Sequence, residues 1–351
     1  MLAVVCHGKK DLRIDTLGDR ALVAGEVRVA VAFGGICGSD LHYYHRGSVG
    51  DFAVREPLVL GHEISGTVIE TGPDVQGLVP GTKAALDPSR PCLRCRYCRI
   101  GRSNLCIDMW FLGSAGRMPH SQGGFAQHLI LRQDQVIALP SSVDLQQIAM
   151  AEPLSVALHA VNRAGPLNGR RVIVAGSGPI GLLIARAARN AGALDVICTD
   201  IEDAPLAVAA RSMGASGTVN VRREPEGLQA CAGDDLAFDV AFESSGSPDA
   251  LASLFRVLRR GGRLVQVGML PPGTTPVPVN MLQSRELDYI GAFRANGEFR
   301  LAVDLIARGD VDVTPILSGT YPLARAVDAM ELAGDRSKVI KLQLAINETG
   351  T

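Results

Sequence analysis

The stretch Gly176-Ser177-Gly178-Pro179-Ile180-Gly181 decides the fold class of this chain, because it joins an apolar run at 171–175 to a stretch of helical length at 179–191. In such a turn the first glycine permits the tight bend, the second lets the backbone approach a pyrophosphate, and the third allows close helix–strand packing. The helix N-terminus then offers unpaired N–H groups to phosphates. We therefore expect Gly176, Gly178, Pro179, Ile180 and Gly181 to bind a dinucleotide cofactor.

Asp200 ends the next apolar run, nineteen residues after Gly181. A carboxylate at that place accepts hydrogen bonds from the ribose hydroxyls and repels a 2′-phosphate, so the sequence predicts NAD in preference to NADP. Arg222 and Arg223 could approach the same end of the cofactor, so NADP use stays open. The alternative, a glycine turn followed by an Asp that only caps a helix, explains fewer of these features.

Strand-like and helix-like segments alternate from residue 170 to about residue 308, which predicts a doubly wound parallel sheet. The first 150 residues instead contain short apolar runs separated by Gly, Pro and Asp, which favours a β-rich domain without a long helix. The expected core strands there are 27–31, 59–60 and 66–69. The later expected strands are 195–199, 238–242, 262–267 and 288–293, and the expected helices are 204–213 and 298–308. Domain boundaries are predicted near residues 155 and 294.

The composition narrows the function classes. With 351 residues, 47% of them hydrophobic and 20% charged, the chain is expected to fold into about two globular domains. A net charge of −1 argues against partners such as nucleic acid or an anionic membrane, and leaves a small-molecule substrate. His7, Lys9 and Lys10 interrupt the first apolar segment, and later apolar runs are too short for a membrane helix. A cytoplasmic location is the expectation.

Four of the eight cysteines, Cys92, Cys95, Cys98 and Cys106, form a Cys-x2-Cys-x2-Cys-x7-Cys pattern in a loop at about 88–110. In a reducing compartment such a cluster indicates a metal rather than disulfides. Four thiolates complete the tetrahedral shell of a structural Zn²⁺. An iron–sulfur cluster is the main alternative, and the seven-residue last gap together with a nicotinamide cofactor favours zinc.

A second set of metal ligands and proton carriers is spread over three segments. Cys37 lies in Gly35-Ile36-Cys37-Gly38-Ser39-Asp40-Leu41-His42, His62 and Glu63 are adjacent, and Glu152 precedes Pro153. Each alone is more often a structural residue. Together with a dinucleotide site they predict a catalytic zinc with three protein ligands and one open position.

These motifs, in this order and at these distances, resemble the zinc-dependent medium-chain alcohol dehydrogenases over essentially the whole chain. The resemblance implies a GroES-like β-rich catalytic domain into which a Rossmann doubly wound parallel sheet is inserted. Residues 1–155 would form the catalytic domain with its zinc lobe, 156–294 the Rossmann domain, and 295–351 the return of the chain to the first domain. Two zinc ions per chain and a homotetramer or homodimer are implied as well.

Glu152 followed by Pro-Leu-Ser-Val-Ala-Leu-His resembles the polyol dehydrogenase branch, whose implied zinc ligands are Cys, His, Glu and water. Whether Glu63 or Glu152 is the direct third ligand stays open. By the same resemblance Ser39 would receive the substrate proton and pass it through the nicotinamide ribose towards His42. Asp40 would orient His62.

Residues 43–52 and 113–125 resemble the L-idonate 5-dehydrogenases, which oxidise a sugar acid to 5-ketogluconate. Tyr43, Phe111 and Arg294 fall where sorbitol dehydrogenases line their substrate pocket, and a guanidinium can hold hydroxyls or a carboxylate bidentately. Ala295 departs from the aromatic residue that those enzymes carry. Sorbitol, xylitol and L-threonine remain alternative substrates. A zinc-supported binding protein without chemistry is disfavoured, because it needs no open metal position.

Overall fold

The computed structural model describes residues 1–233 and 238–347. The chain forms two compact units, one of Met1–Glu152 with Phe299–Thr351 and one of Pro153–Glu298. The alternation of strand-like and helix-like segments in the sequence predicts these boundaries near residues 155 and 294. Within the described residues, no helix is both long and apolar enough to cross a membrane.

The second unit is built on a six-stranded parallel sheet in the order β15-β14-β13-β16-β17-β18. Its strands are β13 (Arg171–Ala175), β14 (Asp195–Asp200), β15 (Gly217–Asn220), β16 (Phe238–Glu243), β17 (Leu258–Gln266) and β18 (Asp288–Gly291). This order consists of two halves that meet between β13 and β16, which is the dinucleotide-binding arrangement. The Rossmann fold expected from the glycine turn is therefore confirmed.

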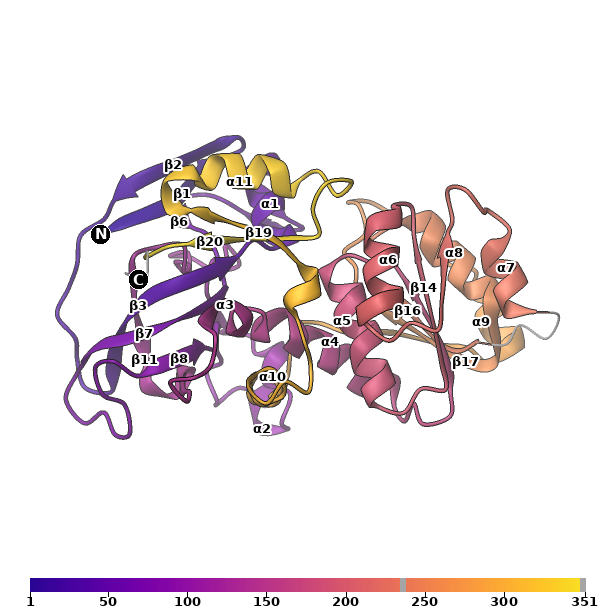
Figure 1. The fold of residues 1–351 in the computed structure, drawn as a ribbon, viewed down its shortest axis with the longest axis horizontal. Coiled ribbons are helices and arrows are strands. Elements are labelled where there is room, and N and C mark those ends of the chain that lie inside the picture. Colours follow the sequence, from indigo (N-terminus) through magenta and orange to yellow (C-terminus); the bar gives the residue numbers. More distant parts are fainter. Residues whose placement is uncertain (234–237, 348–351) are drawn as a thin grey trace. The chain divides into compact units, whose positions relative to one another are not determined.

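Helices pack against this sheet (Figure 1). They are α5 (Pro179–Asn190), α6 (Asp203–Ser212), α7 (Gly227–Ala232), α8 (Pro248–Val257) and α9 (Val279–Arg285), and α4 (Ala151–Ala164) leads from the first unit into the second. Because helices cover the sheet, the middle of its central strand β13 is apolar, and Val172, Ile173 and Val174 are fully buried. Strand β15 was not predicted, because only Val219 in it is strongly apolar.

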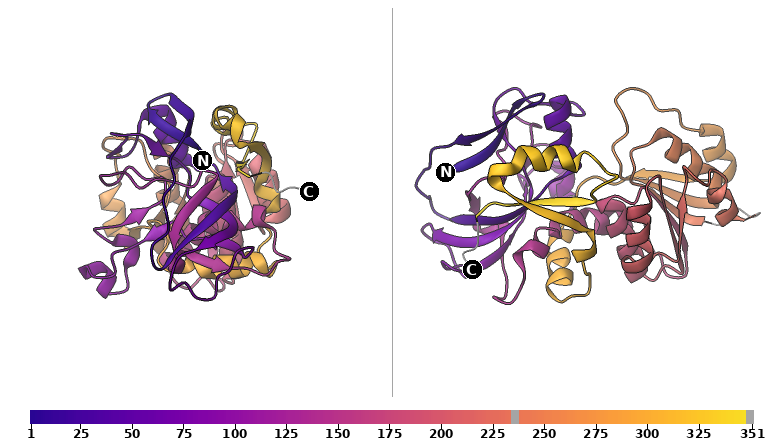
Figure 2. Two further views of the ribbon diagram at one scale, coloured as in Figure 1. Left: turned by 90° about the vertical axis from the view of Figure 1, so that its left-hand side faces the viewer. Right: turned by 45° about the horizontal axis from the view of Figure 1, so that its top comes forward.

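The first unit is organised around a seven-stranded sheet in the order β12-β8-β7-β3-β20-β19, with β11 also paired to β3. Its strands are β3 (Glu26–Gly35), β7 (Glu63–Thr71), β8 (Lys83–Leu86), β11 (His128–Arg132), β12 (Val136–Ala138), β19 (Leu317–Pro322) and β20 (Lys341–Ala345). The C-terminal segment, yellow in Figures 1 and 2, thus returns to pair with the indigo strand β3.

Smaller elements complete the first unit. Its remaining strands are β1 (Leu2–Gly8), β2 (Asp11–Thr16), β4 (Ser48–Val49), β5 (Phe52–Ala53), β6 (Leu58–Val59), β9 (Ser89–Arg90) and β10 (Trp110–Phe111). Its helices are α1 (Gly38–Arg46), α2 (Arg96–Arg99), α3 (Leu145–Ile148), α10 (Glu298–Ala307, of which Glu298 belongs to the second unit) and α11 (Ala326–Ala333). Short 3-10 turns are η1 (Ser103–Leu105), η2 (Gln133–Gln135), η3 (Thr314–Ile316) and η4 (Leu323–Arg325).

Helix α1 was not expected from the apolar pattern, and its ends explain why it forms. At its start the Asp40 carboxylate accepts a hydrogen bond from the Cys37 N–H at 2.9 Å. At its end Gly47 takes a left-handed conformation, with φ of 77°, that closes the last turn. The two caps fix Ser39 and His42 on a rigid element directly after Cys37.

Candidate active site

Strand pairing brings three of the predicted metal ligands together. Gly35, the last residue of β3, is paired with Glu63, the first residue of β7. Cys37 follows β3 by two residues and His62 precedes β7 by one, so both reach the same end of the sheet. One ligand atom each of Cys37, His62 and Glu63 lies within 4.8 Å of the other two.

Asp40 holds the two loops of this site in place. Its side chain is fully buried, and besides the Cys37 N–H it accepts a hydrogen bond from the Gly61 N–H at 3.1 Å. A hydrogen bond from the His62 ring to Asp40 is not formed, because the His62 Nδ1 lies 3.8 Å from the carboxylate and has no hydrogen-bond partner among residues 1–233 and 238–347. Asp40 therefore positions the backbone of the ligands rather than the imidazole ring.

The protonation of the site shows how a metal would fit it. Burial, reinforced by the Glu63 carboxylate, raises the pKa of the Cys37 thiol to about 11. Burial also raises the pKa of Glu152 to about 8, with Glu63 and Cys37 adding to the rise. A divalent cation would replace these protons and compensate the buried anions. A thiol, an imidazole and a carboxylate are a donor set that suits zinc.

Glu152 lies in the first turn of α4, and its side chain is buried. It is close enough to His62, Glu63 and Cys37 for these groups to influence its pKa, yet it lies outside the compact group of three. Of the two glutamates, Glu63 therefore belongs to the compact group of ligand atoms, and Glu152 lies beside it.

Replacing Glu152 with Gln is expected to halve the proton release on zinc binding to this site. At pH 7 the thiol of Cys37 and the carboxyl of Glu152 are both protonated before the metal binds, so binding should release about two protons in the wild type and about one in Glu152→Gln. Apparent zinc affinity should then rise about 100-fold from pH 6 to pH 7 in the wild type and about tenfold in the variant. Chelator competition at the two pH values measures both slopes. Equal slopes would show that Glu152 does not change its protonation when zinc binds.

Two residues of α1 are placed for proton transfer within the first unit. The Ser39 hydroxyl is hydrogen-bonded to the Cys37 thiol. His42 is partly exposed, and burial together with the nearby Arg46 and Arg336 guanidinium groups lowers its pKa. The imidazole is thereby kept neutral and ready to accept a proton.

The predicted substrate residues have different surroundings. Phe111 is buried with its ring 5.5 Å from the His62 ring, so it borders the metal group. Tyr43 is a core residue whose hydroxyl accepts a hydrogen bond from the Ala115 N–H at 3.0 Å. Arg294 belongs to the second unit, has a positive φ of 55° and places its guanidinium over the Phe293 ring.

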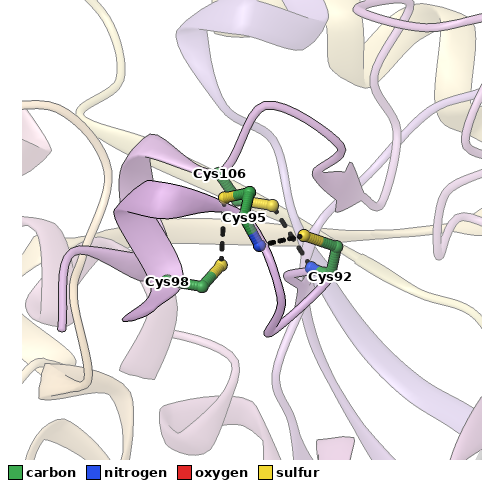
Figure 3. A group of neighbouring side chains, drawn as sticks. All are labelled: Cys92, Cys95, Cys98 and Cys106. Atoms are coloured by element: carbon green, nitrogen blue, oxygen red, sulfur yellow. Dashed lines mark hydrogen bonds between the residues drawn. The ribbon is translucent and has the colours of Figure 1, made fainter. Parts of the chain in front are cut away.

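The four-cysteine loop forms the second candidate metal centre. The sulfur atoms of Cys92, Cys95, Cys98 and Cys106 lie within 4.8 Å of one another (Figure 3). Backbone N–H groups point at the sulfurs, for example from Cys92 to Cys106 at 3.2 Å and from Cys95 to Cys92 at 3.3 Å. Hydrogen bonds from backbone N–H groups, chiefly that of Cys98, lower the pKa of Cys95 to about 6. This closed set of thiols fits a structural zinc and leaves no open position.

The glycine turn of the second unit has the shape required for a dinucleotide. Gly176 has a φ of 89°, and a Cβ on Gly181 would overlap the Gly176 carbonyl. Gly178 is the N-cap of α5, with Pro179 and Ile180 as its first residues. These residues could hold the pyrophosphate of NAD or NADP at the helix N-terminus.

At the adjoining strand end, Asp200 accepts a hydrogen bond from the Ser177 N–H at 2.7 Å. Arg222 and Arg223 pair with Glu202 and Asp203, respectively.

Asp200→Ala is expected to lower the preference for NAD over NADP, measured as the ratio of kcat/KM, by about 10-fold to 100-fold. The reason is the loss of a charged acceptor, whose hydrogen bonds are worth about 1.5–3 kcal/mol each. Asp200→Asn is the matched control, since it retains an acceptor for Ser177 while removing the charge. An unchanged ratio in both variants would exclude Asp200 from cofactor selection.

Two buried charged residues at these sites were missed by sequence reasoning. Glu243 ends β16 and accepts hydrogen bonds from the N–H groups of Ser245 and Gly246, which shapes the loop beside Gly176. Lys341 begins β20 and forms an ion pair with Glu63. In the sequence, each of these two charged residues stands at the end of a largely apolar segment, and that position could have marked them as candidates.

Known proteins share this architecture and these motifs. Residues 23–141 match the family described as alcohol dehydrogenase GroES-like domain, and residues 179–308 match the zinc-binding dehydrogenases. L-idonate 5-dehydrogenase (NAD(P)(+)) of Escherichia coli strain K12 is 40% identical over 316 residues, 90% of each chain. Sorbitol dehydrogenase of Bacillus subtilis strain 168 is 37% identical over 335 residues, 95% of this chain and 93% of the relative. The crystal structure of Escherichia coli L-idonate 5-dehydrogenase matches with a TM-score of 0.93 at 37% identity over 98% of both chains.

A dinucleotide-binding sheet, a GroES-like domain and two metal-ligand groups define a zinc-binding, NAD(P)-dependent dehydrogenase. The chain belongs to the zinc-dependent medium-chain alcohol dehydrogenases, in the group that contains polyol and sugar-acid dehydrogenases. The family resemblance seen in the sequence is thereby confirmed.

Proposed function

We propose that this enzyme oxidises a secondary hydroxyl of a sugar acid, with L-idonate converted to 5-ketogluconate as the leading reaction, and that NAD is the preferred acceptor. The observation that carries the proposal is the group of Cys37, His62 and Glu63, which offers three ligands and leaves a fourth position for substrate. Glu152 is the additional carboxylate beside it.

Cys37, His62 and Glu63 would hold a zinc ion that supplies polarisation of the substrate hydroxyl, and the glycine turn would hold the NAD that supplies the hydride acceptor. Ser39 takes the hydroxyl proton, because its own hydroxyl both accepts and donates hydrogen bonds and it already contacts Cys37. His42, on the same helix and partly exposed, accepts the proton and passes it to solvent. Phe111 covers the His62 ring and excludes water from one side of the group.

The sugar-acid substrate rests on three supports. Residues 43–52 and 113–125 resemble L-idonate 5-dehydrogenases, a protein of that name is 40% identical, and Arg294 can neutralise a carboxylate. The second candidate is a polyol such as sorbitol or xylitol, which the 37% identical sorbitol dehydrogenase favours. L-threonine is a weaker alternative.

The proposal includes two zinc ions per chain, one at Cys37, His62 and Glu63 and one at the four cysteines. It also includes a cytoplasmic location and assembly into a homodimer or homotetramer. Strand β18 supports assembly, because within the described residues it pairs with β17 alone and forms an edge of the parallel sheet.

NADH formation by the purified enzyme tests the substrate assignment. L-idonate, D-gluconate, D-sorbitol, xylitol, L-threonine and a primary alcohol are compared with NAD and separately with NADP, with a chelator-treated control. The proposal expects the highest kcat/KM with L-idonate and NAD, and a selective increase of KM for L-idonate in Arg294→Ala. A higher kcat/KM with sorbitol or xylitol would agree with the proposed oxidation of a secondary hydroxyl but would contradict a sugar acid as the substrate.

A further inference from the structure

Lys341 is a buried cation at the active site for which the proposed reaction has no role. Its side chain is 3% exposed and that of Glu63 is 2% exposed. The Lys341 ammonium forms an ion pair with Oε2 of Glu63 and donates a hydrogen bond to the Ile36 carbonyl at 2.9 Å. Burial of a charge at this depth is costly unless a partner compensates it, so the pair has to stay intact in the folded protein.

The topology of the sheet explains how these two side chains meet. Strand β3 lies between β7 and β20, with Gly35 paired to Glu63 on one side and to Gln343 on the other. Glu63 and Lys341 therefore approach each other across the end of β3. Gly35 leaves the necessary space, since a Cβ there would overlap Oε2 of Glu63 and lie 3.1 Å from Cε of Lys341.

The ion pair engages one of the two carboxylate oxygens of Glu63. Oε2 lies against the Lys341 ammonium, and both side chains are almost fully buried. A carboxylate has a second oxygen, which can still bind a metal.

We propose that Lys341 is a positioning residue that withholds Oε2 of Glu63 from the catalytic zinc and so preserves the open position for substrate. A carboxylate can bind a metal through one oxygen or through both. With Lys341 in place Glu63 supplies one oxygen, whereas without Lys341 its second oxygen is free to fill the site. This inference rests on the proposed zinc site. It adds that Lys341 limits the number of Glu63 oxygens that bind the zinc.

Lys341→Met is the test, with Lys341→Arg as the conservative variant. Lys338→Met is the matched control, because Lys338 is 67% exposed and pairs with Asp335 at the surface. We expect Lys341→Met to lower kcat at least tenfold and to bind zinc at the catalytic site at least tenfold more tightly. Lys341→Arg and Lys338→Met should stay within about threefold of the wild type in both measurements.

Cobalt substitution gives a readout independent of activity. Co²⁺ in the wild type, Lys341→Arg and Lys338→Met should show the intense visible bands of four-coordinate cobalt, and Lys341→Met the weaker bands of five-coordinate cobalt. Lys341→Gln keeps an N–H donor without the charge. If Lys341→Met does not fold, Lys341→Gln is expected to show the same weaker visible bands of five-coordinate cobalt.

The outcomes separate this inference from the proposed function. Wild-type protein with one zinc per chain would reject the catalytic site and this inference with it. With two zincs per chain, an unchanged cobalt spectrum in Lys341→Met and Lys341→Gln would reject the role of Lys341 alone. Weaker zinc binding in Lys341→Met would likewise overturn it, because a merely structural lysine loosens the site when removed.

Discussion

Cys37→Ala is expected to lower kcat by more than about 100-fold, since loss of a group that only supports a metal ligand already costs about 10-fold to 100-fold. The thiol lies beside the buried His62 and Glu63, and two ligands of a set of three would remain. The fold should survive, because Cys37 lies after the last residue of β3 and the sheet hydrogen bonds do not involve its side chain. Steady-state NADH formation and zinc content measure the effect.

Cys198→Ala is the matched control for this variant. Cys198 is also a buried free thiol, but it lies in β14 of the second unit, and no metal-ligand group among the described residues includes it. Its replacement should leave kcat and the zinc content unchanged. Near-normal turnover by Cys37→Ala would contradict the catalytic assignment of Cys37 and of the metal that it is proposed to hold.

Cys98→Ala is expected to lower the unfolding temperature by about 10 °C and the zinc content from two per chain to one. The loop carrying the four cysteines has few regular elements, with the four-residue helix α2 and the 3-10 turn η1 between the ligands. Its exposed apolar residues Leu93, Ile100 and Ile107 show that little core packing supports it. A bound ion would therefore be its main source of stability.

Turnover at low temperature distinguishes Cys98→Ala from Cys37→Ala. At low temperature Cys98→Ala should retain most of its turnover, because the closed cysteine site has no position for substrate. Cys231→Ala, a partly buried thiol outside both metal groups, controls for the loss of a cysteine. Equal stability of Cys98→Ala and Cys231→Ala would show that the four cysteines do not hold a structural zinc.

The second unit could be predicted from the sequence almost strand by strand. In a parallel sheet covered by helices both faces of a strand are buried, so β13 and the middle of β14 appear as continuous apolar runs, and β16 and the end of β17 as shorter apolar segments. Strand β15, with one buried valine and a polar start, did not produce that signal. Helix α1 was missed because its stability comes from its two caps rather than from an apolar stripe.

The four-cysteine centre and the glycine turn were determined by the sequence itself. Each is made from ligands or glycines within a few residues of one another, so spacing along the chain is also spacing in space. Cys37, His62 and Glu152 were candidates by residue type, and the sequence could not say which of them meet. That depended on the register of β3 against β7, which is set by the whole sheet.

Only the tertiary structure decided the surroundings of Glu63. Lys341 is far from it along the chain, and no local pattern links the two. They form a pair because the C-terminal strand β20 inserts beside β3, opposite β7, and because Gly35 leaves space between them. Strand pairing over such distances is a property of the complete sheet. The sequence determined which chemical groups are available, and the fold determined which buried charges must compensate one another.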